Sequence, residues 1–97
     1  IGLGQVKILA IFKQSGAIQI VGGKVIQGSV GRDNLLEIIR NGEIINQGKL
    51  IELQAGRQEV KEVATDQECG LQIESPDALK VGDVLQVYRE EQIFKKL

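Results

Sequence analysis

The sequence predicts an all-β fold of roughly six or seven short strands, either a small sandwich or a small barrel. Short apolar stretches alternate with polar residues, glycine-containing turns separate them, and few segments have helical spacing. Closing such a sheet on itself removes most of its exposed edges. A chain of 97 residues can bury one hydrophobic core, so we expect residues 1–97 to form a single domain.

The first predicted strand covers residues 4–12, because apolar side chains recur there at every second position. Those expected on one face are Val6, Ile8, Ala10 and Phe12. Residues 13–16 are polar and end in a glycine, which predicts a turn. A second strand follows over residues 17–27, and Gly22-Gly23 within it indicates a bulge, a bend or the close approach of another molecule. Residues 28–31 are predicted to form a loop.

Residues 34–40 fit two interpretations. Their apolar side chains could line a helix capped by Asp33, or they could belong to a strand. The following residues favour the strand, because Asn41-Gly42 lies between β-branched residues and is the strongest short signal for a hairpin. We therefore predict two strands joined by a tight turn, with further strand at residues 49–53.

The second half of the chain alternates in the same way, and Cys69, Leu71 and Ile73 are expected to share one face of a strand. The charged residues 89–97 are expected to be a tail that frays. The other predicted elements are a loop at residues 54–58, a short strand or turn from Val60 to Ala64, a strand at residues 67–74, a break at residues 75–77 and a last strand at residues 83–88.

The composition excludes several classes of function. The formal charge is −1, from 12 basic and 13 acidic residues, whereas nucleic-acid-binding domains usually have a positive excess. Any contact with RNA must therefore be local, or supported by other domains. Because the chain has no histidine, the usual zinc sites and catalytic triads are excluded, and we expect neither a metal site nor enzyme activity. A single cysteine excludes an internal disulfide and fits a cytoplasmic location.

Local motifs add no catalytic group. Gly22-Gly23-Lys24 lacks the spacing of a phosphate-binding loop. Cys69 has no base nearby in sequence, and we expect it to line the core or a pocket. The longest apolar run, Ile8 to Phe12, is far shorter than the roughly 20 residues that cross a membrane. The chain starts at Ile1 without a signal peptide, and we expect it to be a fragment excised from a longer protein.

Three segments together resemble the last domain of bacterial translation initiation factor two. They are residues 41–50, residues 63–73 and residues 79–85, and the likeness extends from about Gly4 to Tyr88. The most specific part is Glu68-Cys69-Gly70, whereas Gly82-Asp83 is shared by many translation-factor barrels. Arg40 and Gly48 stand where the family's hairpin motif opens and closes.

This resemblance implies a small closed antiparallel barrel of about six strands, similar to the second domain of elongation factor Tu and excised from the C-terminus of a larger GTPase factor. It implies a module that holds the formylmethionyl end of initiator tRNA for the small ribosomal subunit. The implied partners are that tRNA and the ribosome, without DNA or a membrane, and the implied state is a monomer. No cofactor is expected in this domain, because GTP and Mg²⁺ would bind the absent GTPase domain.

The resemblance also implies a binding site. Phe12-Lys13 and Glu68-Cys69-Gly70 match the family's pocket in full, whereas Gly22-Gly23-Lys24 keeps only the first glycine of a Gly-Cys-Tyr segment. Residues 54–57 keep only the last positive charge of a Lys-Arg-aromatic-Lys loop. The implied tRNA-binding residues are Phe12, Lys13, Gly22, Gly23, Lys24, Arg57, Glu68, Cys69 and Gly70.

Several of these residues also have a structural explanation. Gly22-Gly23 could be a bend of the barrel, Phe12 could belong to the core, and Glu68 could pair with a lysine. Lys24 and Arg57 could be ordinary solvent-facing charges. Two alternatives to tRNA binding therefore stay open at this point. One is a docking barrel of a translation GTPase with little or no tRNA contact, and the other is the barrel that directly follows the GTPase domain of the same factor.

Overall fold

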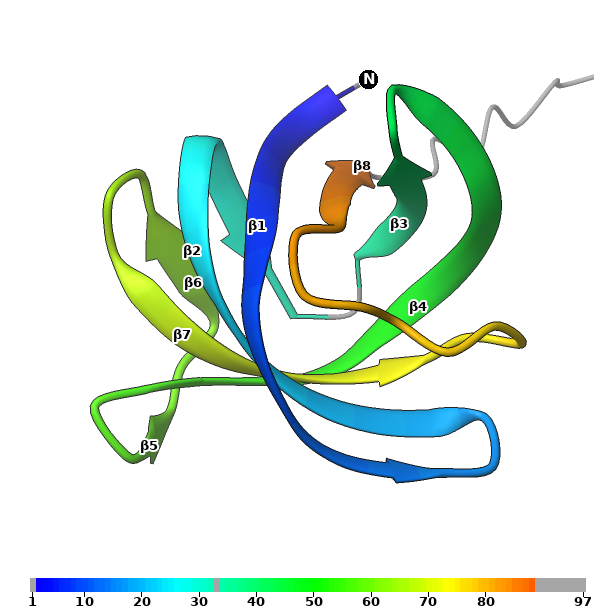
Figure 1. The fold of residues 1–97 in the computed structure, drawn as a ribbon. Coiled ribbons are helices and arrows are strands. Elements are labelled where there is room, and N and C mark those ends of the chain that lie inside the picture. The colour runs from blue at the N-terminus through cyan, green and yellow to red at the C-terminus, as the bar shows by residue number, and fades with distance from the viewer. Residues whose placement is uncertain (1, 33, 89–97) are drawn as a thin grey trace, which may run out of the picture.

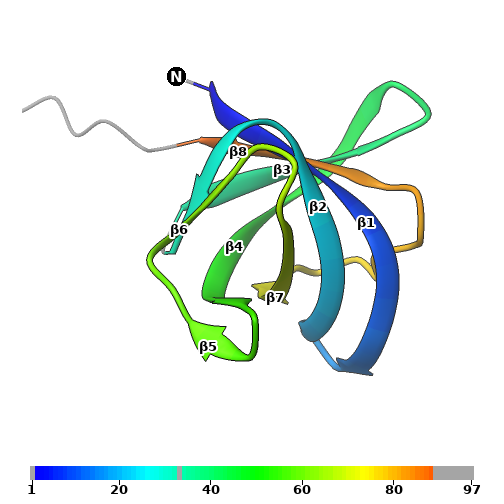
Figure 2. The same cartoon turned by 90° about the vertical axis from the view of Figure 1, so that its left-hand side faces the viewer.

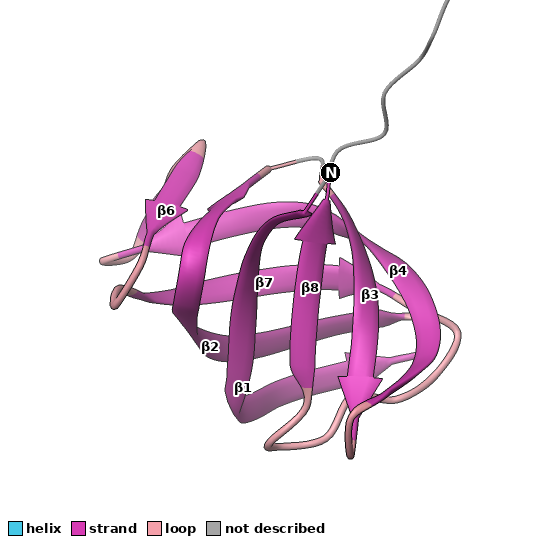
Figure 3. Ribbon diagram, turned by 90° about the horizontal axis from the view of Figure 1, so that it is seen from above, coloured by secondary structure: helices cyan, strands magenta, loops and turns pink. Residues whose placement is uncertain are grey.

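Strands form all the regular secondary structure in the part of the chain that the structure describes (Figure 3). The structure is a computed structural model, and it describes residues 2–32 and 34–88. The predicted fraying of residues 89–97 falls outside these residues. The strands are β1 (Gly2–Ser15), β2 (Ile18–Gly31), β3 (Leu35–Arg40), β4 (Glu43–Ala55), β5 (Gln58–Glu59), β6 (Glu62–Ala64), β7 (Glu68–Glu74) and β8 (Val84–Tyr88).

Six of the strands close into a barrel. Hydrogen-bonded neighbours follow the order β1-β8-β3-β4-β7-β2, and β2 pairs again with β1 to complete the ring. All of these pairings are antiparallel. β6 adds to β2 and β5 adds to β4 as short extensions, which leave the ring at one side (Figures 1 and 2). The predicted barrel of about six strands is confirmed.

The interior of the ring is a single apolar core, formed because alternate side chains of every barrel strand point inward. Leu36 and Ile38 are fully buried, which confirms that residues 35–40 form a strand and that the helical interpretation was wrong. The other fully or almost fully buried apolar residues are Val6, Ile8, Val21, Val25, Val30, Leu50, Leu53, Val63, Leu71, Ile73, Leu79, Leu85 and Val87.

Two tight hairpins depend on left-handed backbone. Asn41 and Gly42 have φ values of 53° and 79°, as the Asn-Gly signal predicts. Gly56 and Arg57, with φ values of 61° and 68°, form a second two-residue turn between β4 and β5. The predicted loop at residues 54–58 is therefore wrong. β4 continues to Ala55, residues 56–57 form the turn, and β5 begins at Gln58.

The predicted ends of the first two strands were also wrong. β1 continues to Ser15, so the turn is confined to residues 16–17, and the predicted loop at residues 28–31 is the end of β2. Val30 in that segment is fully buried and pairs with Val63 of β6. The physical reason is that β6, distant in sequence, satisfies the backbone groups there, and a local pattern contains no sign of such a partner.

Bulges in β1 change which side chains face the core. Between Ile8 and Ile11 of β1, two residues oppose Gly22 of β2, and Leu9 is the extra residue. A second shift makes Phe12 an extra residue. Ile11 consequently packs against the core, while 68% of the Phe12 surface is exposed. The single face predicted for residues 6–12 is therefore wrong beyond Ile8, because each bulge reverses the alternation.

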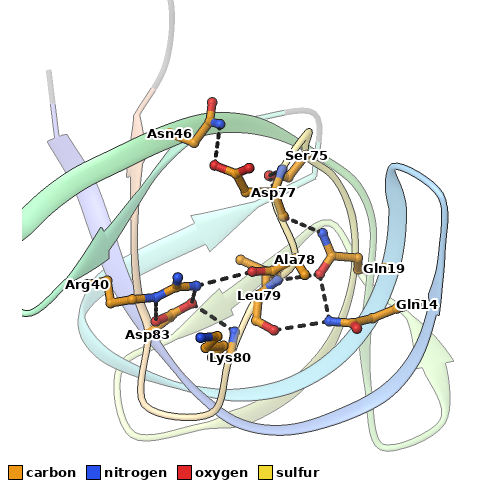
Figure 4. Close-up of polar contacts among 10 residues, drawn as sticks. All are labelled: Gln14, Gln19, Arg40, Asn46, Ser75, Asp77, Ala78, Leu79, Lys80 and Asp83. Atoms are coloured by element: carbon orange, nitrogen blue, oxygen red, sulfur yellow. Dashed lines mark hydrogen bonds and ion pairs between the residues drawn. The ribbon is translucent and has the colours of Figure 1, made fainter.

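A polar network holds the segment between β7 and β8 against the barrel (Figure 4). The side chain of Gln19, which is buried, accepts a hydrogen bond from the Leu79 N–H at 2.6 Å and donates one to the Asp77 carbonyl at 2.8 Å. Arg40 donates to both carboxylate oxygens of Asp83, at 2.9 and 2.8 Å. The segment is thus fixed by side chains from β2 and β3.

The Asp83 carboxylate is 3% exposed and also accepts a hydrogen bond from the Lys80 N–H at 2.8 Å. Burial alone would raise the pKa of Asp83, but the hydrogen bonds from Arg40 and Lys80 outweigh it and lower that pKa. Gly82, with a φ of 96°, makes the turn that brings Asp83 to this position. Arg40 and Gly82-Asp83, which belong to the resemblance, are therefore residues of the scaffold.

Within the described ranges, no helix is long and apolar enough to cross a membrane. Among the same residues, no three His, Cys, Asp or Glu side chains are grouped so that they could hold a metal ion.

Candidate functional site

The outer surface of the barrel carries a pocket of about 390 Å³ over β1, β2 and β7, bordered by the β4–β5 hairpin. This volume lies within the range of small-molecule sites, and the pocket is open to solvent. Its lining residues are Leu9, Ala10, Phe12, Gly22, Gly23, Gln54, Gly56, Arg57, Glu68, Cys69 and Gly70.

The floor of the pocket is backbone. In the sheet register Gly22 of β2 lies opposite Gly70 of β7, and Ala10 and Gln54 continue the same line on β1 and β4. We call these four residues the glycine row. Val21, Leu53 and Leu71, which adjoin the row along β2, β4 and β7, are buried in the core, so the row faces outward, and its two glycines place no side chain over the floor.

The three strand glycines of the pocket, Gly22, Gly23 and Gly70, differ in what surrounds them. A Cβ on Gly23 would lie 2.6 Å from Val6 Cγ1 and 2.9 Å from the Lys7 carbonyl oxygen, so this glycine permits close packing inside the barrel. A Cβ on Gly22 would lie 3.0 Å from two ring carbons of Phe12. A Cβ on Gly70 would meet only the Gln54 Cβ, at 3.8 Å, and would point into the pocket.

The two bulged residues of β1 wall the pocket. Leu9 and Phe12 are 43% and 68% exposed, and both line it. The proposal that Phe12 belongs to the core is therefore wrong, because the bulge turns its ring outward over Gly22. Exposed apolar side chains of this kind gathered around a concave surface are a common feature of binding sites.

Cys69 is an inert part of the wall. Its side chain is 6% exposed, and burial raises the pKa of its thiol to about 11. The thiol therefore stays protonated at neutral pH and is not a nucleophile. The prediction that Cys69 lines the core or a pocket is confirmed.

The structure brings most of the sequence-predicted site residues together. Gly22 and Gly23 lie directly opposite Gly70 and Cys69. Lys24 lies opposite Glu68 at the edge of the pocket but does not line it, and Lys13 lies opposite Ile20, also outside the lining. The seven predicted residues in the lining are Phe12, Gly22, Gly23, Arg57, Glu68, Cys69 and Gly70.

Sequence reasoning missed Leu9, Ala10, Gln54 and Gly56, which also line the pocket. Gln54 and Gly56 belong to the loop that the resemblance assigned to the pocket, but only the charge of Arg57 was kept from it, and the register sets Gln54 opposite Gly70. Leu9 had no signal at all, since a strict alternation assigns it to the face opposite Phe12 and only the bulges place both at the pocket.

The chain is similar in sequence to known proteins, although no protein-family model matches it. Translation initiation factor IF-2 of Nitrobacter winogradskyi is 40% identical over 95 residues, which are 98% of this chain and 11% of that protein. IF-2 of Acetivibrio thermocellus is 40% identical over 91 residues, and IF-2 of Ligilactobacillus salivarius is 42% identical over 90 residues. The chain spans only 9 to 12% of the length of these relatives.

Solved structures share the fold. Translation elongation factor SelB from Methanococcus maripaludis superposes with a TM-score of 0.73 and 21% identity over 86% of this chain and 18% of its own. GDP-bound aIF5B from Aeropyrum pernix gives a TM-score of 0.71 and 19% identity over 90% of this chain and 15% of its own.

The closed antiparallel barrel is thus a fold that occurs as a domain of translation factors. At identities this low the structural likeness speaks for the fold alone. The sequence similarity is more specific than the structural similarity, because it covers nearly the whole chain at about 40% identity. This chain belongs to the translation initiation factor IF-2 family, as the counterpart of one short segment of those proteins.

Proposed function

We propose that this chain binds the formylmethionyl end of initiator tRNA and holds it for the small ribosomal subunit. The proposal rests on membership of the IF-2 family together with a pocket whose floor is backbone. It makes the ribosome and initiator tRNA partners of the chain in the cytoplasm. GTP hydrolysis would belong to other segments of an IF-2 protein, since the chain spans about a tenth of its relatives.

The chemistry of the ligand fits such a pocket. Formylation converts the α-amine, whose pKa is about 7.7–8.0, into a neutral amide that can donate and accept hydrogen bonds. With no side chains at Gly22 and Gly70 that amide can lie flat on the sheet, where a strand carbonyl oxygen has a second lone pair that could accept from its N–H. Burying an unformylated ammonium without a partner would cost on the order of several kcal/mol. The positive charge of Arg57 and the negative charge of Glu68 cancel in the lining, so the net charge of the lining does not favour an ammonium group.

Gly70 is the observation that best supports a ligand here. Its φ lies outside the left-handed region, and a Cβ would contact only Gln54, so the fold itself does not require glycine at this position. A side chain there would instead occupy space directly above the floor. A glycine that the scaffold does not need, set in a backbone floor, supports the proposal that another molecule uses the space.

The test compares Gly70→Val with Gln86→Val, which places the same side chain on the half-buried outer side of β8, outside the pocket lining. Amide NMR spectra are recorded during titration with formylmethionyl-tRNA and with a formylmethionyl-adenosine amide at up to roughly millimolar ligand. The wild-type chain and Gln86→Val should show shifts around Gly23 and Cys69. Gly70→Val should keep its dispersed spectrum, and its affinity for the ligands should fall by at least about tenfold.

Absence of these shifts in the wild-type chain would refute tRNA-end binding. In that case the docking barrel becomes the better hypothesis, and a parent factor carrying Gly70→Val should still support subunit joining at the wild-type rate.

A further inference from the structure

The outer face around the pocket is organised in three parallel rows. The glycine row lies in the middle. The charged row consists of Lys7, Lys24 and Glu68, which follow one another across β1, β2 and β7. The distal row, on the other side, consists of Lys13, Ile20, Gln72 and Glu52 across β1, β2, β7 and β4. Neighbouring rows are two residues apart along β2, or about 7 Å.

The charged row contains a directly opposed pair of like charges. Lys7 and Lys24 are register partners on neighbouring strands, and both are exposed. Opposed like charges destabilise a sheet. Within residues 2–32 and 34–88, the one ion pair shorter than 4.0 Å joins Arg40 to Asp83, so neither lysine is neutralised at that distance there. A bound anion would relieve this repulsion.

Arg57 adds a third positive charge at the same end. β4 runs antiparallel to β7 and leaves the glycine row at Gln54, so its hairpin continues toward Glu68. Three cations therefore stand against the single carboxylate of Glu68 at this end of the pocket. In the distal row the charges of Lys13 and Glu52 cancel.

The distal row borders a second, smaller recess of about 190 Å³. Phe12, Gln54 and Gly70 line both recesses, so the two form one continuous surface. The exposed apolar side chains of the second recess are those of Phe12 and Ile20.

We propose that the acylated nucleotide end lies across the three rows in one direction. The 5′-phosphate of the terminal nucleotide sits over Lys7 and Lys24, the formamide lies on the glycine row, and the methionine side chain enters the recess between Phe12 and Ile20. This inference rests on the proposed function, and it adds Lys7 and Ile20 to the binding residues. The phosphate lies on the β1–β2 side of the charged row because Glu68 occupies the β7 side.

The experiment uses two amide-linked ligands, formylmethionyl-adenosine with and without a 5′-phosphate, at low salt. The phosphate should strengthen binding to the wild-type chain by about three- to tenfold. In the Lys7→Gln/Lys24→Gln variant most of this difference should be lost, because only Arg57 of the three cations remains, and the affinity for the phosphate-free ligand should be unchanged. Lys49→Gln, an exposed charge change outside both recesses, is the matched control and should retain the full difference.

A second arm tests the other end of the ligand. Ile20→Ser should weaken the formylmethionyl ligand several-fold and leave a formylglycyl ligand unaffected, because only the longer side chain reaches the distal recess. Thermal unfolding without ligand gives an independent readout. Lys7→Gln should not lower the midpoint, since it removes a repulsion and no packed group.

The outcomes separate the inference from the proposed function. If the wild-type chain binds but Lys7→Gln/Lys24→Gln keeps the phosphate effect, the inference is overturned and the proposed function stands. If Lys13→Gln abolishes the phosphate effect instead, the ligand lies in the opposite direction and the inference is equally wrong. If neither ligand binds, both fail together.

Discussion

Replacing Phe12 with alanine should separate the stability of this barrel from its binding. A phenylalanine buried in a core contributes about 3–5 kcal/mol relative to alanine. The Phe12 surface is 68% exposed, so about a third of a surface on the order of 200 Å² is buried. At about 25 cal/mol per Å² this corresponds to roughly 1.5 kcal/mol. We therefore expect Phe12→Ala to lower the free energy of unfolding by about 1–2 kcal/mol and to abolish detectable ligand binding.

The contact with Gly22 makes this prediction sharper. A Cβ on Gly22 would lie 3.0 Å from the Phe12 ring, so Gly22→Ala should destabilise the wild-type chain by about 1 kcal/mol. In a chain that already carries Phe12→Ala the same methyl group has room, and the cost should disappear. Urea unfolding of the four chains gives the coupling energy directly. Additive effects, or a loss above about 3 kcal/mol for Phe12→Ala alone, would refute the outward position of the ring.

Three further predictions concern the scaffold. The pKa of Asp83 is lowered in the folded chain, so its contribution to stability is complete above the unfolded value of about 3.9 and is lost as pH falls through the folded pKa. Unfolding of Asp83→Asn below pH 5 should therefore depend less on pH than that of the wild type, and an equal slope would contradict the account. Cys69 should resist iodoacetamide at pH 8 until the chain is unfolded, because the pKa of its thiol is about 11; rapid labelling of folded chain would show otherwise. Leu50→Ala, at a fully buried position, should cost about 2–5 kcal/mol in urea unfolding, and a loss below about 1 kcal/mol would mean that the core is loosely packed there.

Several residues behind the family resemblance support the barrel and do not line the pocket. Arg40 and Asp83 join β3 to the segment before β8 through two hydrogen bonds. A Cβ on Gly48 would lie 2.6 Å from the Glu74 carbonyl oxygen, so glycine there permits close contact between β4 and β7. The positions where this chain departs from the family, residues 22–24 and 54–57, lie at the pocket and its edge. The resemblance therefore includes residues that support the barrel, and around the pocket it is divided: Glu68-Cys69-Gly70 matches the family, whereas residues 22–24 and 54–57 depart from it.

Local sequence determined the class of fold and several of its elements. Alternating apolar residues specified strands such as residues 68–74, because the period of a strand is two residues and needs no information from elsewhere. Asn41-Gly42 specified its hairpin, since few dipeptides adopt two consecutive positive φ values at low cost. The family resemblance predicted site residues at Gly22-Gly23 and Glu68-Cys69-Gly70, and the structure places these residues in the lining of one pocket.

Only the tertiary structure decided how these parts form a site. The register of β2 against β7 sets Gly22 opposite Gly70, and the bulges of β1 turn Leu9 and Phe12 out over them. Lys7 and Lys24 are 17 positions apart in the chain, and pairing alone makes them neighbours. Register and bulges minimise the free energy of the whole closed sheet, in which each barrel strand is constrained by two neighbours, at least one of them distant in sequence. A pattern within one strand does not contain that constraint.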